Sequence, residues 1–267
     1  MPSAKDGARV AADVVADVVA HRSCPVLGLA TGSSPLGLYA ELARRCRSGA
    51  LHLGSTRAFA LDEYVGLRPD HPQSYASVIR DAVVVPLGLD PDLVHVPDGS
   101  ADDVVGACRA YEQSIQGAGG VDVQILGIGV NGHIGFNEPT SSFASRTRIK
   151  TLSPQTRADN ARFFDKPGDV PEHCITQGLG TIAEARRLVL LAQGAHKARA
   201  VTAMVEGPVS AMCPASALQM HPYATVIVDE LAASGLTLSS YYNYVYEHKP
   251  PWQRPSSTSQ HHSEVSP

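Results

Sequence analysis

The richest chemistry in the sequence lies in residues 127–139, GIGVNGHIGFNEP, where His133 and Glu138 stand among four glycines. The preceding run, residues 121–126, is short, β-branched and almost wholly apolar, which is typical of a strand buried on both faces of a parallel sheet. Open α/β sheets bind ligands beyond the carboxyl ends of their strands. The histidine and the carboxylate are therefore expected at a ligand site, where both can take part in acid/base chemistry.

Residues 127–132 also match G-x-G-x-x-G, the dinucleotide-binding pattern. That pattern should open a helix and be followed about 20 residues later by an acid that binds a ribose hydroxyl. Here Gly135 and Pro139 interrupt any helix, and the downstream charges are basic: Arg146, Arg148 and Lys150. This context favours a phosphate or carboxylate ligand over a dinucleotide.

A second carboxylate candidate follows the apolar run 57–61, which leads directly into Asp62 and Glu63. Two acids at the end of a strand form either a solvated turn or a functional carboxylate at the ligand-binding rim. Proton abstraction beside a carbonyl needs one carboxylate base and one polarising or proton-donating group. Asp62 and His133 would supply this pair. A histidine alone is more often structural, but the glycines on both sides of His133 favour catalysis.

Anion-binding candidates come from a third segment. A predicted strand at 25–30 is followed by the loop Thr31-Gly32-Ser33-Ser34 and a helix at 35–47. Free backbone N–H groups, hydroxyls and a helix N-terminus in one place favour an anion, whereas the plainer alternative is that Ser34 only caps the helix. Lys197, in the first turn of a predicted helix at 197–205, and Arg162 are further candidates, with simple surface exposure as the alternative for Lys197.

The hydrophobic periodicity predicts a single-domain α/β fold over residues 1–247, with a Rossmann-like open, mainly parallel sheet and helices on both faces. Further helices are expected at 5–20, 75–84, 102–116 and 155–164, and further strands at 188–192 and 223–228. Alternation would place Arg146, Arg148 and Lys150 on one face of a strand, and residues 165–171 could hinge a lid. Because the chain opens on a helix, a first edge strand is expected to be missing. The tail, 248–267, is expected to be disordered.

Composition excludes several classes of protein. The net charge of −4 over 267 residues gives no basic excess for nucleic acid. Five scattered cysteines suggest neither a disulfide framework nor a zinc site, and no signal peptide or membrane span is evident, so a cytoplasmic location is expected. Neither G-x-S-x-G nor a metal-ligand spacing occurs. The residues thus predict acid/base chemistry without metal or cofactor on a small phosphorylated or carboxylated substrate.

Four motifs then carry a family resemblance. LDEYVGL (61–67), SYASVIRD (74–81), the loop 127–139 and SSFASRTRIKTLSPQTRADNARFF (141–164) together resemble the glucosamine-6-phosphate deaminase (isomerase) family, over about residues 4–246. The related 6-phosphogluconolactonases have a similar glycine-histidine loop but lack F-N-E-P and L-D-E-Y. The resemblance implies conversion of glucosamine 6-phosphate to fructose 6-phosphate and ammonia, in amino-sugar catabolism.

The resemblance also implies roles for particular residues. His133 would open the sugar ring, Asp62 would move a proton between C2 and C1, and Glu138 would orient His133. The phosphate would be held by Thr31, Gly32, Ser33, Ser34, Arg162 and Lys197. Two positions depart from the usual pattern: Asn131, where many members have Asp, and Ala60, where Asn is usual. We expect activity to survive with Asn131, leaving Glu138 as the only charged partner of His133.

Some members of the family are hexamers activated by N-acetylglucosamine 6-phosphate, and others lack this control. The resemblance therefore implies a homo-oligomer, with an activator site at Ser141, Ser142, Arg148, Lys150 and Tyr241. Two alternatives stay open. A lactonase would hydrolyse a sugar-phosphate lactone without releasing ammonia, and a non-catalytic sugar-phosphate sensor would have no need of both Asp62 and His133.

Overall fold

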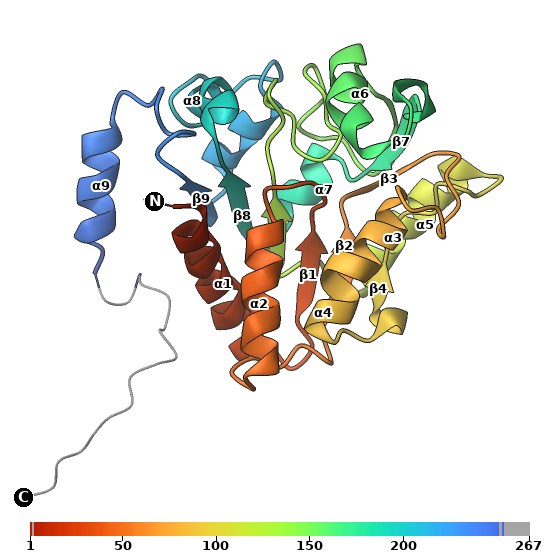
Figure 1. Ribbon diagram of the computed structural model, residues 1–267, viewed down its shortest axis with the longest axis horizontal. Coiled ribbons are helices and arrows are strands. Elements are labelled where there is room, and N and C mark those ends of the chain that lie inside the picture. The colour runs from red at the N-terminus through yellow and green to blue at the C-terminus, as the bar shows by residue number, and fades with distance from the viewer. Residues whose placement is uncertain (2, 251–252, 254–267) are drawn as a thin grey trace, which may run out of the picture.

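The main sheet of the protein is parallel throughout. The computed structural model describes residues 1, 3–250 and 253, and within them six strands lie in the order β4-β2-β1-β5-β8-β9, each hydrogen-bonded in parallel to its neighbours (Figure 1). This confirms the predicted open parallel α/β fold. The strands are β1 (Val26–Leu29), β2 (Arg57–Ala60), β4 (Val94–His95), β5 (Val123–Leu126), β8 (Arg187–Ala192) and β9 (Ala224–Val228).

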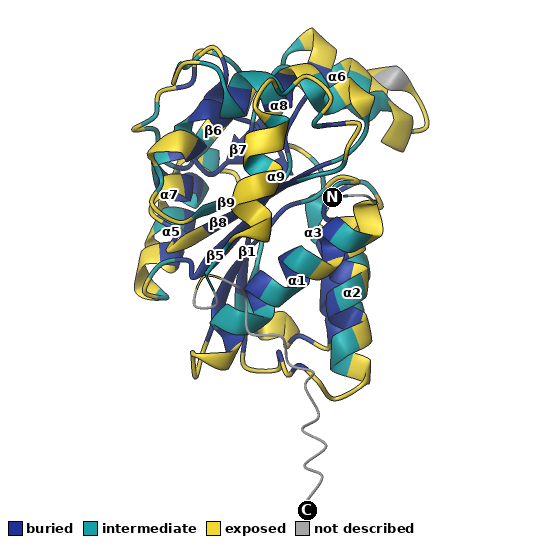
Figure 2. Ribbon diagram, turned by 90° about the vertical axis from the view of Figure 1, so that its left-hand side faces the viewer, coloured by how far each residue is buried: buried dark blue, intermediate teal, exposed yellow. Residues whose placement is uncertain are grey.

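Helices cover both faces of this sheet, as Figure 2 shows: α1 and α2 lie on one side of the strands, α5 and α7 on the other. In α1, Ala8, Ala11, Ala12 and Val15 recur at helical spacing and are buried, which explains why the helix packs there. Among the described residues, the α-helices outside residues 75–87 are α1 (Ala4–Ala20), α2 (Leu36–Arg47), α5 (Val104–Gly117), α6 (Pro154–Asn160), α7 (Leu179–Ala183), α8 (Ala198–Val205) and α9 (Ser239–Glu247).

A second, antiparallel sheet was not predicted from the sequence. It has the order β3-β7-β6, formed by β3 (Asp62–Tyr64), β7 (His173–Thr176) and β6 (Arg148–Thr151). Only Leu61 separates β2 from β3, so the chain passes from the large sheet to the small one immediately before Asp62. Instead of ending in a turn, Asp62 and Glu63 are part of a strand. A small apolar cluster packs here: Tyr64, Phe136, Leu152, Val170 and Cys174.

The start of α2 differs from the predicted one. The helix begins at Leu36 with Pro35 as its N-cap, and no side chain caps it. The Pro35 carbonyl accepts the first intrahelical hydrogen bond, from the backbone N–H of Tyr39 at 3.0 Å, and no described backbone N–H donates to the Ser34 hydroxyl. The capping alternative for Ser34 was therefore wrong.

The helix predicted at 75–84 is a composite of three short pieces. They are α3 (Tyr75–Ile79), the π-helical turn Arg80–Val84 and α4 (Val85–Leu87), which ends at Gly88 in the left-handed conformation. Pro86 lacks a backbone N–H, so the regular ladder cannot run unbroken through this segment. The segment is helical as predicted, but it is longer and irregular.

The prediction of a strand that carries three basic residues on one face was only partly correct. Arg148 and Lys150 alternate in β6, whereas Arg146 precedes the strand and forms ion pairs with Glu112 and Glu184. Most of the predicted disordered tail, 248–267, lies outside the described residues, and the missing edge strand stays a prediction. In the part of the chain that is described, no helix is long and apolar enough to cross a membrane.

Candidate active site

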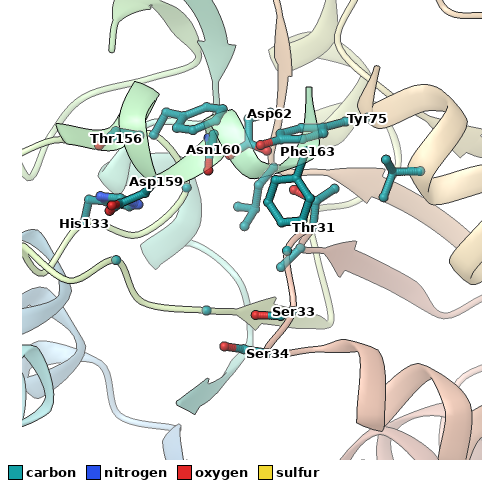
Figure 3. A pocket seen from close by; sticks show the side chains of 18 of the residues that line it. Thr31, Ser33, Ser34, Asp62, Tyr75, His133, Thr156, Asp159, Asn160 and Phe163 are labelled. Atoms are coloured by element: carbon teal, nitrogen blue, oxygen red, sulfur yellow. The ribbon is translucent and has the colours of Figure 1, made fainter. Parts of the chain in front are cut away.

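A pocket of about 300 Å³ opens at the carboxyl ends of the parallel strands (Figure 3). The loop after β1, Asp62 after β2 and His133 after β5 all line it. Lys197 reaches it from the segment after β8, and Arg162 from the turn after α6. The tertiary structure thus brings together every residue predicted to bind substrate and two of those predicted to react. The other two, Asn131 and Glu138, are attached to His133 from outside the pocket lining.

The two adjacent acids have different environments. The Glu63 carboxylate accepts hydrogen bonds from the backbone N–H groups of Tyr64, Tyr75 and Ala76, at 2.8, 2.9 and 2.9 Å, and so anchors the start of α3. Asp62 is only 5 % exposed, yet no described residue donates a hydrogen bond to its carboxyl group. Burial, together with the neighbouring Glu63 charge, raises the pKa of Asp62 well above its ordinary value. An unpartnered carboxyl in a pocket is a strong proton acceptor once ionised.

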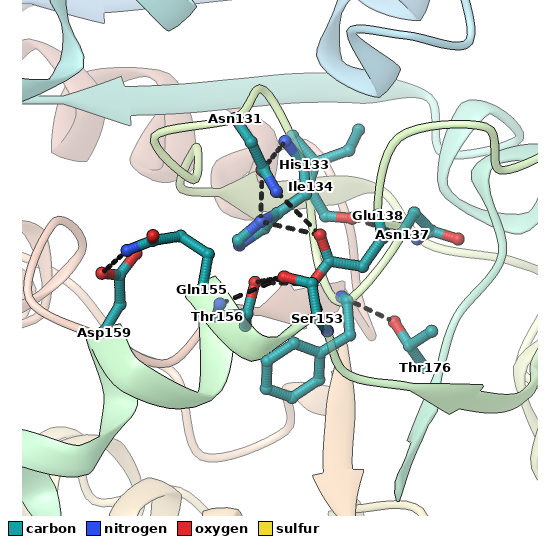
Figure 4. Close-up of polar contacts among 11 residues, drawn as sticks. Asn131, His133, Ile134, Asn137, Glu138, Ser153, Gln155, Thr156, Asp159 and Thr176 are labelled. Atoms are coloured by element: carbon teal, nitrogen blue, oxygen red, sulfur yellow. Dashed lines mark hydrogen bonds and ion pairs between the residues drawn. The ribbon is translucent and has the colours of Figure 1, made fainter. Parts of the chain in front are cut away.

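His133 is held by an amide that stands between it and Glu138 (Figure 4). The Asn131 side-chain oxygen accepts from the backbone N–H of His133 at 3.2 Å and lies 2.7 Å from its Nδ1. The Asn131 amide nitrogen donates to Glu138 Oε2 at 2.8 Å. An amide oxygen can only accept hydrogen bonds, so Nδ1 must carry the proton of the contact with Asn131. The neutral ring therefore has its free lone pair on Nε2.

Glu138 acts on His133 mainly through this amide. Its Oε2 lies 3.9 Å from His133 Nδ1, beyond hydrogen-bonding distance, while its Oε1 accepts from Thr156 Oγ1 at 2.5 Å. Burial raises the pKa of Glu138, but the hydrogen bond from Thr156 and the nearby His133 bring it below its ordinary value. Burial lowers the pKa of His133, and the Glu138 charge only partly opposes that effect. The site therefore favours a neutral histidine beside an ionised carboxylate.

Two glycines make room for these side chains. A Cβ at Gly129 would lie 2.1 Å from His133 Cε1, so the ring packs directly on the Gly129 backbone. The flanking glycines were expected to leave His133 unpacked, and this expectation was wrong. Gly135 has φ +53°, and a Cβ there would come within 2.9 Å of Thr176 Oγ1. The glycines of the motif let the backbone approach the reacting groups closely.

The other end of the pocket suits an anion. Among the described residues, no hydrogen bond ties down the hydroxyls of Ser33 and Ser34, which stand before the uncapped N-terminus of α2. Lys197 is half-buried, and burial lowers its pKa, while Arg162 is exposed and stacks over Phe163 at 4.7 Å. Free amides, hydroxyls and two cations meet here. In the described parts of the chain, no group of three His, Cys, Asp or Glu side chains could hold a metal ion.

Sequence reasoning missed one wall of the pocket. It is formed by residues on α6 and the turn after it: Thr156, Asp159, Asn160 and Phe163. Asn160 also donates to the hydroxyl of Tyr64 at 2.9 Å, which fastens this wall to β3. Counted from residue 156, these four residues occupy positions i, i+3, i+4 and i+7, which lie on one face of a helix. That periodicity around Arg162 was a signal that could have found them.

The five residues predicted for an activator do not meet within one chain. Arg148 and Lys150 lie on β6 in the small sheet, while Tyr241 is 60 % exposed on α9, on the opposite side of the molecule in Figure 1. Ser141 is buried and its hydroxyl has no partner, whereas Ser142 is exposed. Among the residues described, no hydrogen bond or ion pair joins any two of the five.

The parallel sheet, the loop with free hydroxyls before α2, and the carboxylate and histidine at one rim define the class of α/β enzymes that act on small metabolites. The model of one family, described as glucosamine-6-phosphate isomerases/6-phosphogluconolactonase, matches residues 3–227. The chain belongs to this family.

Two curated deaminases and two solved structures are among the proteins similar to this chain. Glucosamine-6-phosphate deaminase of Streptomyces coelicolor is 58 % identical over 95 % of this chain and 97 % of its own. The enzyme of Cutibacterium acnes is 60 % identical over 88 % of this chain and 90 % of its own. A solved monomeric glucosamine-6-phosphate deaminase is 42 % identical with a TM-score of 0.86, covering 88 % of this chain and 98 % of that one. A 6-phosphogluconolactonase from Leishmania guyanensis, 21 % identical with a TM-score of 0.70 over 88 % of this chain and 97 % of that one, shares the fold alone.

Proposed function

We propose that this protein converts glucosamine 6-phosphate to fructose 6-phosphate and ammonia. The observation that carries the proposal is the pairing, in one pocket, of the unpartnered Asp62 carboxyl with a His133 ring whose Nε2 is free. The high identity to glucosamine-6-phosphate deaminases supports the choice of substrate.

The phosphate of the substrate binds at the loop Thr31-Gly32-Ser33-Ser34, with Lys197 and Arg162 closing the other side. This assignment is supported by the free serine hydroxyls, the uncapped start of α2 and the two cations that line the pocket. Asp62 lies at the end of the pocket away from Ser33 and Ser34, and His133 lies to one side (Figure 3). A six-carbon sugar phosphate has its reacting carbons, C1 and C2, at the end away from the phosphate.

The reaction proceeds in three steps. Neutral His133 takes the proton of the C1 hydroxyl on Nε2 and delivers it to the ring oxygen, so that the bond between C1 and the ring oxygen breaks and the pyranose opens to an aldehyde. Asp62 takes the proton from C2 and returns it to C1, while the oxygen on C1 gains the proton that the amino group gives up, which converts the amino aldose to the imine of the ketose. Water then adds to C2 and ammonia leaves. Asn131 and Glu138 act as positioning residues, because they hold the His133 ring and fix its tautomer.

The lactonase and sensor alternatives fit less well. The lactonases among the solved relatives share only 18–22 % identity with this chain, against 57–60 % for the curated deaminases. A lactone hydrolase also needs no proton carrier at Asp62, and a sensor would not need to bury an unpartnered carboxyl at the cost of stability.

The proposal is tested by measuring ammonia and fructose 6-phosphate together, starting from glucosamine 6-phosphate and purified protein with no added metal. We expect the two products in equal amounts, and we expect the Asp62→Asn variant to form neither. A folded wild-type protein that binds the sugar phosphate without releasing ammonia would overturn the proposal.

Activation by N-acetylglucosamine 6-phosphate at the five matched residues requires a homo-oligomer, such as a hexamer, because Tyr241 of one chain cannot join the other four in the same chain. We propose that assembly and activation therefore occur together or not at all. Light scattering gives the molecular mass, and kinetics with and without the activator give its effect. A monomer that is still activated would contradict this link.

A further inference from the structure

Asp159 is a carboxylate in the pocket for which the proposed reaction gives no task. It lies on α6, is half-buried and lines the pocket on the same side as His133, away from Asp62 (Figure 3). Its Oδ1 accepts a hydrogen bond from Gln155 Nε2 at 2.8 Å. No described residue hydrogen-bonds to its other oxygen. A half-buried carboxylate with one free oxygen beside a ligand site is available to accept a hydrogen bond.

Two charged groups fix the position of Asp159 along the pocket. Burial lowers the pKa values of both His133 and Lys197, and the Asp159 charge acts against burial in both cases. Asp159 is therefore within electrostatic reach of both side chains. It forms no ion pair with Lys197 within 4.0 Å, so Lys197 stays free for an anion. Asp159 thus lies near His133, which opens the ring, and near Lys197 at the phosphate end of the pocket, and it forms an ion pair with neither.

The chemistry of the sugar indicates what lies at such a place. In a hexose 6-phosphate, C5 is bonded to the ring oxygen, to C6 and to C4. His133 serves the ring oxygen, and Lys197 serves the phosphate carried on C6. A group near both of them faces the third substituent of C5, which is C4 with its hydroxyl. Lys197 and Arg162 can only donate hydrogen bonds, so a hydroxyl that donates needs an acceptor here.

We propose that Asp159 is a specificity-determining residue whose free carboxylate oxygen accepts a hydrogen bond from the C4 hydroxyl of the bound sugar phosphate. This inference rests on the proposed function, because it uses the orientation of the substrate given there. Through this hydrogen bond, helix α6 recognises the sugar as well as covering the pocket. A hydrogen bond to a charged acceptor is stronger than one between neutral groups, so its loss should be measurable.

The test compares glucosamine 6-phosphate with its 4-deoxy analogue as substrates. We expect the wild-type protein to lose about 10- to 100-fold in kcat/KM when the C4 hydroxyl is absent. Asp159→Ala should lose a similar factor with the full substrate and nothing further with the analogue. Asp159→Asn keeps an uncharged acceptor and should fall between the two. Thermal melting of each variant checks that it is folded.

Gln155→Ala is the matched control, because it removes the same intrahelical hydrogen bond and leaves the carboxylate in place. It should discriminate between the two substrates as the wild type does. If folded Asp159→Ala still discriminates like the wild type while the wild type is active, the inference fails and the proposed function stands. If the wild type forms no ammonia from glucosamine 6-phosphate, the proposed function fails and the inference falls with it.

Discussion

Asp62 and Glu63 are neighbours in strand β3, but only Glu63 is satisfied: three backbone N–H groups bond to it, whereas no described residue bonds to the Asp62 carboxyl. Successive side chains of a strand point to opposite faces, so one acid reaches the start of α3 and the other reaches the pocket. The strand thus fixes an unpartnered carboxyl in the pocket next to one that is fully hydrogen-bonded. Its unfavourable burial is tolerated because the surrounding sheet and α3 hold it in place.

Replacing Asp62 should separate stability from activity. We expect Asp62→Asn to lower kcat by about 10²–10⁴-fold or more, so that almost no product forms. The same variant should be more stable at neutral pH by about 1–3 kcal/mol, because it removes an unpartnered buried charge. Glu63→Gln is the matched control and should be less stable, since it weakens three hydrogen bonds. Denaturant unfolding measures both, and an Asp62→Asn variant less stable than wild type would contradict the account.

The stability effect of Asp62 should depend on pH. Burial raises the pKa of Asp62 in the folded state, so the folded state holds this proton more tightly than the unfolded chain. Stability linked to the group is complete below the unfolded value of about 3.9 and is lost as the pH rises through the folded pKa. The advantage of Asp62→Asn should therefore vanish below about pH 4. Unfolding curves across the pH range test this, and a constant difference would refute it.

The amide between His133 and Glu138 sets the basicity of the histidine. Asn131→Asp should raise the pKa of His133 by roughly 1 unit, because a charge replaces a dipole 2.7 Å from Nδ1. The new carboxylate also loses the donor to Glu138, which leaves two carboxylates beside His133, so both favour its protonated form. We expect activity to survive, with the limb of the kcat/KM profile that belongs to His133 moved to higher pH. An unchanged profile would count against any electrostatic role of position 131.

Gly129 should be essential for activity more than for folding. A Cβ there would overlap the His133 ring, which must then move by about 1 Å or more. Displacement of a reacting group on this scale can cost about 100-fold in rate. We expect Gly129→Ala to lose about that factor in kcat, while Gly54→Ala, which has open space around it, should lose none. Steady-state kinetics decide the matter, and a fully active Gly129→Ala would show that the ring position is not critical.

Lys197 should matter for the phosphate of the substrate. It is half-buried, and burial lowers its pKa, so its charge is available where water screens it poorly. We expect Lys197→Ala to weaken the binding of inorganic phosphate about tenfold or more. Lys5→Ala, on the exposed side of α1, is the control and should bind like the wild type. Calorimetry with phosphate measures both, and equal affinities would exclude Lys197 from the anion site.

The sequence by itself determined the alternation of strands and helices, because periods of two and 3.6 residues are local properties. It also made Asp62, His133 and the loop before α2 candidates, since each lies in a segment that follows an apolar strand and ligand sites in parallel sheets lie at those ends. The helix start at Leu36 and the π-helical turn before Pro86 could not be predicted from the sequence, because each depends on details of one or two peptide units.

Only the tertiary structure decided which of two adjacent acids lies unpartnered in the pocket and what surrounds His133. Asp62 faces the pocket because β3 pairs with β7, which brings Asp62 opposite Thr176 from a distant part of the chain. Likewise, Asp159 enters the pocket because α6 is fastened to β3 by Asn160 and Tyr64. Such contacts join segments that no local pattern connects, so their residue types alone cannot specify them. The candidate reacting residues lie in short sequence motifs, whereas the partners that position them come from packing between remote segments.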